Sequence, residues 1–325
     1  MQNQLIASKY ELIEMAGQGG MATVWRGVMR GAANFARPVA VKHILPQLSS
    51  NPEFVAMFVE EARVGSQLQH PNIVQIIDFE QDLERKSYYL VMEWVEGLDL
   101  SRYLAVLEGA GQSPPWPLVT AICVDALRGL SAAHERLDGA GKPAPVYHRD
   151  VAPQNILIGV NGIVKLTDFG LARAMDRARM TSPLIIKGKL RYLSPELTLG
   201  NPATVQSDLF SMGVVLWEAL AHEPLYKGAT DVEVFMQARK GEIPSLAKKR
   251  GDLPDELVRL IERSLAHDPA QRFASAKEML RGMTELLRRV TQFTDAYAIS
   301  ESVGRARQLI AQAAPPAPHP PPIPK

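Results

Sequence analysis

The sequence predicts an α+β protein of two lobes: a small lobe built from an antiparallel sheet and one helix, and a larger, mainly helical lobe. Two observations predict this division. Before about residue 95, short segments rich in branched and aromatic residues recur at 23–28, 39–44, 74–79 and 88–93, which is typical of strands. From residue 100 onward, long helical patterns dominate, at 118–137, 207–221, 254–265 and 276–290.

One helix interrupts the strands of the small lobe. Its apolar residues fall on a single stripe: Phe54, Met57, Phe58, Val64 and Leu68. The segment 207–221 is apolar nearly all round, which predicts a buried central helix. We therefore expect lobes at 1–95 and 96–290, a helical extension at 291–313 and a tail at 314–325.

The tail and the composition limit the possible partners. Residues 315–325 hold seven prolines, so we expect an extended linker or disordered end, with a ligand for a proline-binding partner as the weaker alternative. The formal net charge of +1 favours neither nucleic acid nor a membrane surface. A single cysteine, Cys123, excludes an internal disulfide, and neither a membrane span nor a signal peptide is evident, so we expect a cytoplasmic protein.

The first motif is a glycine-rich stretch between two predicted strands, from Gly17 through Gly19 to Val24. Glycines allow backbone amides to approach a phosphate that side chains would keep away. Ala22 replaces the third glycine of the usual pattern and is small enough to be tolerated there. Any hairpin with glycines looks similar, so this motif gains weight only from the motifs further along the chain.

The next candidate is Lys42, which shares one face of a strand with Ala40. Ala40 would leave room for a flat base, and Lys42 could reach the α and β phosphates of a nucleotide. Glu61 lies on the apolar stripe of the next helix, where a carboxylate needs a partner, and Lys42 is the natural one. The alternative is that Glu61 is solvated at the edge of the stripe; Glu60 fits the pairing worse.

Two further stretches carry the chemistry, residues 148–155 (His-Arg-Asp-Val-Ala-Pro-Gln-Asn) and 168–170 (Asp-Phe-Gly). Phosphoryl transfer from Mg-ATP needs one carboxylate to receive the proton of the attacking hydroxyl, and an amide and a second carboxylate to hold metal. Asp150, Asn155 and Asp168 supply these groups in the required order. Three unrelated polar turn residues would explain neither the spacing nor the apolar strand between them.

Taken together, these motifs resemble those of a eukaryotic-type (Hanks-type) serine/threonine protein kinase of bacteria, from about residue 10 to 284. The resemblance implies the two-lobed protein-kinase fold, with ATP and Mg²⁺ (or Mn²⁺) as cofactors. It makes Met92 the gatekeeper, Glu93 to Val95 the adenine-binding hinge and Asp99 a ribose contact. The implied nucleotide-site positions are Gly17, Gly19, Val24, Ala40, Lys42, Glu61, Met92, Glu93, Val95 and Asp99.

The resemblance also assigns supporting residues. Asp208 matches an acid that hydrogen-bonds the backbone of the catalytic loop, which is the stretch 148–155. Glu196 and Arg272 match a buried ion pair beneath the substrate loop, which favours a protein substrate over a small molecule. Arg149 before Asp150 is associated with control by phosphorylation of the activation segment.

Two positions depart from the serine/threonine pattern. Ala152 replaces a lysine that neutralises the γ-phosphate in this family. Lys189 replaces a threonine that, in the family, contacts both the catalytic aspartate and that lysine. Our hypothesis is that Lys189 supplies the missing catalytic cation; the alternative is that it is solvated. The loss at Ala152 keeps a nucleotide-binding pseudokinase open as a rival.

A tyrosine or dual-specificity kinase is the remaining alternative. Tyrosine kinases also carry alanine at the position of Ala152, but they have arginine where this chain has Gln154, and Arg191 leaves the question open. We expect a protein serine/threonine kinase that phosphorylates itself in a bacterial signalling pathway. Thr181 and Ser182 are the best-placed phosphate acceptors in the activation segment.

Overall fold

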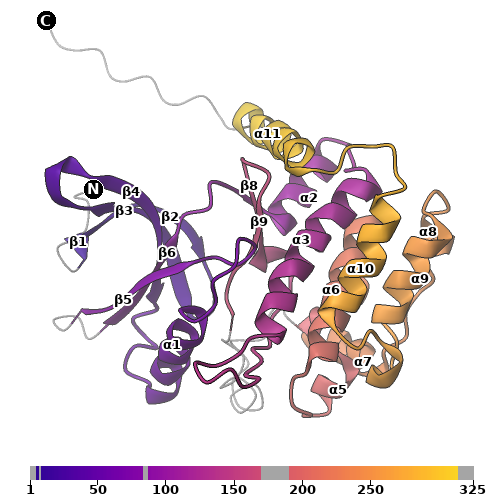
Figure 1. Ribbon diagram of the computed structural model, residues 1–325, viewed down its shortest axis with the longest axis horizontal. Coiled ribbons are helices and arrows are strands. Elements are labelled where there is room, and N and C mark those ends of the chain that lie inside the picture. Colours follow the sequence, from indigo (N-terminus) through magenta and orange to yellow (C-terminus); the bar gives the residue numbers. More distant parts are fainter. Residues whose placement is uncertain (1–4, 7–8, 83–86, 170–189, 314–325) are drawn as a thin grey trace, which may run out of the picture.

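The computed structural model describes residues 5–6, 9–82, 87–169 and 190–313. A six-stranded sheet and one helix form a small N-terminal lobe, and the other helices lie in a larger C-terminal lobe (Figure 1). The predicted two-lobed α+β fold is therefore confirmed. Three of the candidate residues, Thr181, Ser182 and Lys189, lie outside the described residues, as does the proline-rich tail.

The N-lobe sheet has six strands, all of whose pairings are antiparallel, in the order β1-β2-β3-β4-β6-β5. Their bounds are β1 Leu5–Ile6, β2 Tyr10–Gln18, β3 Ala22–Arg30, β4 Ala36–Ile44, β5 Ile76–Asp82 and β6 Ser87–Glu93. Side chains alternate across the sheet, so that Ala40 and Ile44 join the core under helix α1 (Pro52–Gly65), while Val39 and Val41 join a second core on the opposite face. This alternation places Lys42 on the face toward α1.

The C-lobe combines helices with a three-stranded sheet. Its helices are α2 Leu100–Gly109, α3 Trp116–His134, α5 Pro195–Thr198, α6 Val205–Ala221, α7 Asp231–Lys240, α8 Leu246–Lys249, α9 Asp255–Ser264, α10 Ala276–Leu287 and α11 Ala296–Ala313. The strands are β7 Gly97–Asp99, β8 Ile156–Gly159 and β9 Val164–Leu166, in that order across the sheet. Residues 148–155, one of the two stretches that the sequence singled out, lead directly into β8 of this sheet.

Helices α3 and α6 form the centre of the C-lobe. Helix α6 is buried along nearly its whole length, as its apolar pattern predicted. Helix α3 is long and apolar enough to cross a membrane, yet 72% of that window is buried inside the fold, so α3 serves as a core helix. Burial raises the pKa of the Cys123 thiol in α3 to about 12, which makes this cysteine a small hydrophobic core residue.

Two predicted boundaries are wrong for physical reasons. The helix predicted to run to residue 137 ends at His134, because the Val146 amide bonds to the Ala133 carbonyl and draws the returning chain against the helix end. The strand predicted to begin at residue 74 begins at Ile76. The Val74 amide instead bonds to the Leu166 carbonyl at 2.8 Å, which joins the two lobes.

Candidate active site

Lys42 lies at the meeting point of the two lobes. Its Nζ donates to Glu61 Oε1 at 2.7 Å and to Asp168 Oδ1 at 2.9 Å, and its side chain is 6% exposed. Glu61 is buried on α1, whereas Glu60 points outward and pairs with Arg63. The expected partnership of Lys42 with Glu61 is confirmed, and the solvated alternative is wrong.

The charge of Lys42 is maintained in spite of its burial. Burial alone would lower the pKa of this amine, but the carboxylates of Asp168 and Glu61 outweigh that effect and raise the pKa above its ordinary value. Lys42 is therefore a fixed cation. A cation held this way can face a phosphate without itself losing a proton.

The glycine-rich stretch forms the hairpin between β2 and β3. The Gly19 amide bonds to the Ala22 carbonyl at 2.8 Å, and Gly17 is paired with Val24 across the hairpin. A Cβ built on Gly17 would meet no atom within 4 Å. The fold itself therefore leaves open space at this position, as a ligand-facing glycine requires.

Val24, Ala40 and Met92 lie on neighbouring strands beside Lys42. Val24 is opposite Lys42, and Ala40 is opposite Met92. Ala40 and Met92 are buried and belong to the core under α1. A small buried cavity lies behind Met92, bounded by Glu61, Phe169 and other side chains. The wider surface depressions lie elsewhere on the C-lobe and are lined by none of the predicted site residues.

The hinge residues are held from several sides. The Glu93 carboxylate accepts from the Gln75 amide and from Lys165 Nζ of β9, each at 2.8 Å. Val95 is half-buried against the core under α1. Asp99 caps helix α2 by accepting from the Arg102 amide at 2.9 Å, so one of its oxygens has a structural role beside any contact to ribose.

The catalytic loop is fixed by Asp208 in the first turn of α6. Its carboxylate accepts from the amides of His148 (2.7 Å) and Arg149 (2.8 Å) and bonds to His134 Nε2 (2.8 Å). Burial would raise the pKa of Asp208, but these donors and the nearby histidines lower it below its ordinary value. Arg149 has a left-handed φ of 66°, and the two amide bonds hold it in this disfavoured conformation.

Asp150, Asn155 and Asp168 lie in the segments that the sequence singled out. Asn155 Nδ2 donates to Asp150 Oδ2 at 3.0 Å and to the Asp150 carbonyl at 2.7 Å, which orients both side chains. The Asn155 carbonyl accepts from the Thr167 amide, tying the loop to Asp168. Because Asn155 donates through nitrogen, its Oδ1 can serve as a metal ligand. An amide oxygen with the Asp168 carboxylate is a donor set that suits a hard cation such as Mg²⁺.

Ala152 is 4% exposed and belongs to the C-lobe core. Its carbonyl accepts from the Asn155 amide at 2.9 Å, so the loop keeps its shape without a lysine at this position. The backbone that carries Asp150 and Asn155 is thus intact.

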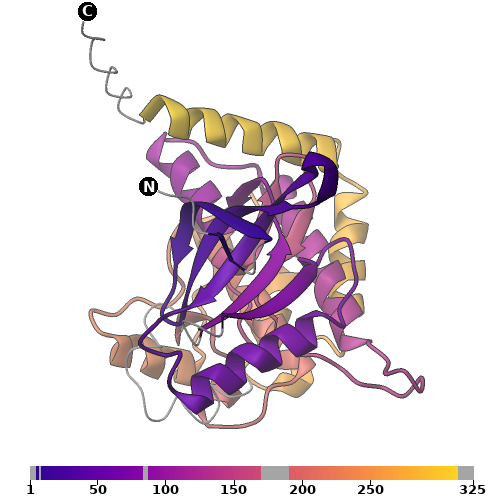
Figure 2. The ribbon, with the colours of Figure 1, turned by 90° about the vertical axis from the view of Figure 1, so that its left-hand side faces the viewer.

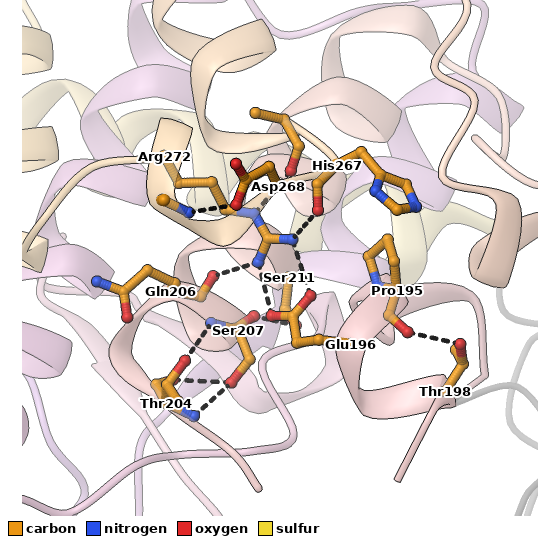
Figure 3. A network of polar contacts seen from close by, with 12 residues as sticks. Pro195, Glu196, Thr198, Thr204, Gln206, Ser207, Ser211, His267, Asp268 and Arg272 are labelled. Atoms are coloured by element: carbon orange, nitrogen blue, oxygen red, sulfur yellow. Dashed lines mark hydrogen bonds and ion pairs between the residues drawn. The ribbon is translucent and has the colours of Figure 1, made fainter. Parts of the chain in front are cut away.

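The predicted ion pair between Glu196 and Arg272 is present. Arg272 contacts both carboxylate oxygens of Glu196, at 2.7 and 2.8 Å, and also bonds to backbone carbonyls of Gln206, Ala266 and His267 (Figure 3). The Arg272 side chain is fully buried and its guanidinium lies 4.7 Å from the ring of Phe210.

Sequence reasoning missed several residues that position the site. His134 supports Asp208, Asn72 Nδ2 bonds to the Val164 carbonyl at 2.8 Å, and Lys165 holds Glu93. His134 falls inside the apolar helix predicted at 118–137, and a histidine buried there needs a polar partner; this was the available signal. Lys165 lies on a strand of three residues, too short to be detected by its periodicity.

Comparison with known proteins identifies this arrangement. The protein kinase domain model matches residues 10–283. The tyrosine-protein kinase MasK of Myxococcus xanthus is 38% identical over 268 residues, covering 82% of this chain and 41% of that protein. The serine/threonine-protein kinase PknA of Mycobacterium tuberculosis is 36% identical over 273 residues, covering 83% of this chain and 59% of that protein. PrkC of Bacillus subtilis, also a serine/threonine-protein kinase, is 32% identical over 274 residues, covering 84% of this chain and 40% of that protein.

This chain therefore spans about two fifths to three fifths of the length of these relatives. Among solved structures, the kinase domain of M. tuberculosis PknI matches with a TM-score of 0.65 and 24% identity, covering 88% of this chain and 98% of that one. That likeness concerns the fold. The family match and the sequence relatives together show that the chain belongs to the protein kinase family, among the bacterial kinases of eukaryotic (Hanks) type.

Proposed function

We propose that this protein kinase transfers the γ-phosphoryl group of ATP, with Mg²⁺ or Mn²⁺, to serine and threonine hydroxyls of proteins, including its own. The observation that carries the proposal is the buried Lys42, bonded to both Glu61 and Asp168. This contact joins the nucleotide-facing sheet to the segment that would hold metal. It is the arrangement that a nucleotide-competent kinase needs.

Each residue has a distinct task in this proposal. Lys42, fixed in its charged form, contacts the α and β phosphates, and the backbone of the Gly17–Val24 hairpin covers them. Asn155 Oδ1 and the Asp168 carboxylate would hold the metal, whose positive charge would offset the charge that develops on the phosphates. Asp150, oriented by Asn155, receives the proton of the attacking hydroxyl. Met92, Glu93 and Val95 border the adenine, and Asp99 contacts the ribose.

The test is incubation with labelled ATP and Mg²⁺ or Mn²⁺, followed by mass spectrometry of the phosphorylated residues. Asp150→Asn should lower turnover by a factor of about 100 to 10,000, as loss of a general base does. Asp231→Asn, on the exposed first turn of α7, is the matched control and should remain active. Nucleotide binding without any transfer by the wild type would instead support the pseudokinase alternative.

Specificity for serine and threonine is supported by Gln154, which replaces an arginine typical of tyrosine kinases, and by the relatives PknA and PrkC. A second candidate, a tyrosine or dual-specificity kinase, is favoured by Ala152 and by the similarity to MasK, whose name describes a tyrosine kinase. Phosphoamino-acid analysis of the autophosphorylated protein separates the two. Phosphotyrosine alone would overturn the first assignment.

We also propose, from the sequence alone, that Lys189 supplies the cation missing at Ala152. Lys189→Ala should lose most turnover, and Lys189→Thr should not restore it, while Lys187→Ala serves as the neighbouring control. Near-normal turnover of Lys189→Ala would disprove the relocation.

Thr181 and Ser182 are the proposed phosphosites. If mass spectrometry of the active protein found phosphate on neither residue, this proposal would be wrong.

The organisation proposed for the chain is a nucleotide-binding lobe at 1–95, a catalytic lobe at 96–290, a helical extension at 291–313 and a proline-rich tail at 314–325. We propose that the tail acts as a linker or as a ligand for a partner. We further propose that this domain is cytoplasmic and phosphorylates protein substrates in a bacterial signalling pathway. Because the relatives are longer than this chain, these statements concern the kinase domain only.

A further inference from the structure

Helix α11 lies beyond the part of the chain that the kinase family model matches, which ends at residue 283. It nevertheless lies along the C-lobe beside α2 (Figures 1 and 2). Its buried residues Ile299, Val303 and Ala306 recur every three or four positions and join the C-lobe core. The helix contacts α2, α3 and the strands β7 and β8, and β7 comes directly after the hinge.

Specific polar contacts fix the position of α11. Ser302 Oγ and Tyr103 Oη are 2.7 Å apart in the buried contact with α2, and Ser300 Oγ donates to the Val160 carbonyl at 2.6 Å. Gly162, with a φ of 76°, approaches the start of α11 so closely that a Cβ there would lie 1.7 Å from the Ala296 carbonyl oxygen. The helix is therefore docked in one register, which gives its other side chains defined partners.

One of those partners is Glu96, two residues after Trp94 in the hinge. Arg307 of α11 donates to Glu96 Oε1, and Trp94 Nε1 donates to Glu96 Oε2 at 2.8 Å. Arg26 of β3 reaches the same carboxylate at 3.8 Å and lies 5.6 Å from the Trp94 ring. The donation from Trp94, together with the charges of the two arginines, lowers the pKa of Glu96 and keeps it ionised at neutral pH.

Glu96 thus connects three elements: the hinge, helix α11 and the N-lobe strand β3, whose Arg26 is paired with Ala40. We propose that α11 braces the hinge through Arg307 and Glu96 and thereby sets the affinity of the kinase for ATP. Arg307 is a positioning residue, because it acts on the hinge backbone through Glu96. This inference rests on the proposed adenine contacts of Glu93 and Val95.

The test measures ATP KM and kcat, with ADP affinity by calorimetry, for Arg307→Ala and for Arg305→Ala, an exposed arginine on the same helix. An ion pair that is about two-fifths exposed predicts that Arg307→Ala weakens ATP and ADP binding by about twofold to fivefold at low salt, with kcat unchanged. Arg305→Ala should match the wild type, and Arg307→Lys should recover part of the affinity. Glu96→Gln should weaken binding to a similar extent, and adding Arg307→Ala to it should cause little further loss.

Several outcomes would overturn the brace. One is that Arg307→Ala binds nucleotide as tightly as the wild type, with or without a fall in melting temperature. Another is that Arg307→Ala and Arg305→Ala lose the same amount of nucleotide affinity. A third is that the losses of affinity add up in the double variant. If the wild type itself binds no nucleotide, the proposed function fails first. If the wild type and Arg305→Ala bind normally and Arg307→Ala does too, only the brace fails.

Discussion

At the scale of single residues, the C-lobe depends on buried charges whose hydrogen-bonding groups are satisfied. Arg272 is the clearest case, because each of its five N–H donors has an acceptor: two on Glu196 and one on each of three backbone carbonyls. Lysine has three donors on a single nitrogen and cannot reproduce this fork. The whole set of partners is therefore specific for arginine.

Arg272→Ala should lower the free energy of unfolding by about 3–5 kcal/mol, because it leaves Glu196 as a largely buried carboxylate without its cation. Urea denaturation at neutral pH measures this loss. The exposed pair of Arg63 and Glu60 provides the control, since Arg63→Ala should leave the free energy of unfolding nearly unchanged. Equal losses in the two variants would contradict a special role for the buried pair.

His148 gives the catalytic loop a dependence on pH. Its Nδ1 accepts from the Asp150 amide and its Nε2 donates to the Thr167 carbonyl, so the neutral ring is satisfied on both sides. Burial lowers the pKa of His148, and the nearby carboxylates only partly oppose that effect. The unfolded state therefore binds a proton more readily than the folded state.

The stabilising contribution of His148 is present above its ordinary pKa of 6.5 and is lost as pH falls below that value. Between pH 7.5 and 5.5 the wild type should lose up to about 1.4 kcal/mol that His148→Phe does not lose. Denaturant titrations at the two pH values give the difference. The same loss of stability between these pH values in His148→Phe as in the wild type would contradict the prediction.

At the scale of elements, helix α6 presents Asp208 to the catalytic loop, so its first turn must be well fixed. A capping box does this: the Thr204 hydroxyl accepts from the Ser207 amide at 3.3 Å, and the Ser207 hydroxyl accepts from the Thr204 amide at 2.9 Å. Asp208 is the next residue and lies in the favourable field of the helix N-terminus.

Thr204→Ala should therefore lower the free energy of unfolding by about 1 kcal/mol. Thr204→Ser should keep most of the wild-type stability, because serine caps a helix equally well. Chemical denaturation at pH 7.5 measures both. The loss should be accompanied by lower turnover, since fraying at Thr204 displaces Asp208 from the amides of His148 and Arg149. Wild-type stability in Thr204→Ala would show that burial alone fixes the helix start.

Much of this architecture was predictable from the sequence, because burial imposes periodicity. The long helices and the central strands carry strong apolar patterns, and the predicted segments agree with α1, α3, α6, α9 and α10 to within a few residues at their ends. Helix α7 was missed because only Val234 and Ala238 are buried along it. The contact of Arg307 with Glu96 joins charged residues 211 positions apart, and no local pattern indicates such a pair.

In the candidate active site too, some contacts were predictable from the sequence and others were not. The pairing of Lys42 with Glu61 was predictable from a carboxylate on an apolar stripe, which is a local signal. The support of the catalytic loop by Asp208 was expected from the family resemblance alone, because no spacing rule connects a helix start with a loop 59 residues earlier. The second role of Asp99 as a helix cap became evident only in the structure.

At the scale of the whole molecule, the two lobes are joined by contacts that lie on both sides of the proposed nucleotide site. Lys42 of the N-lobe bonds to Asp168, and the Glu93 carboxylate bonds to Lys165 of the C-lobe sheet. The Val74 amide adds a backbone bond to Leu166. A ligand that contacts both lobes should add to these links and stabilise the whole fold.

ADP with Mg²⁺ should therefore raise the melting temperature, since a ligand at a hundred times its dissociation constant stabilises the folded state by about 2.7 kcal/mol. Removing the metal with EDTA should reduce the shift, because we propose that Asn155 and Asp168 contribute to binding through the metal. Asp168→Asn should show a smaller metal-dependent part of the shift than the wild type, while Asp231→Asn, at an exposed position on α7, should keep all of it. Differential scanning fluorimetry over a range of ADP concentrations, with and without EDTA, measures each part. An equal shift in EDTA for the wild type would show that Asn155 and Asp168 hold no metal, and the pseudokinase alternative would then gain support.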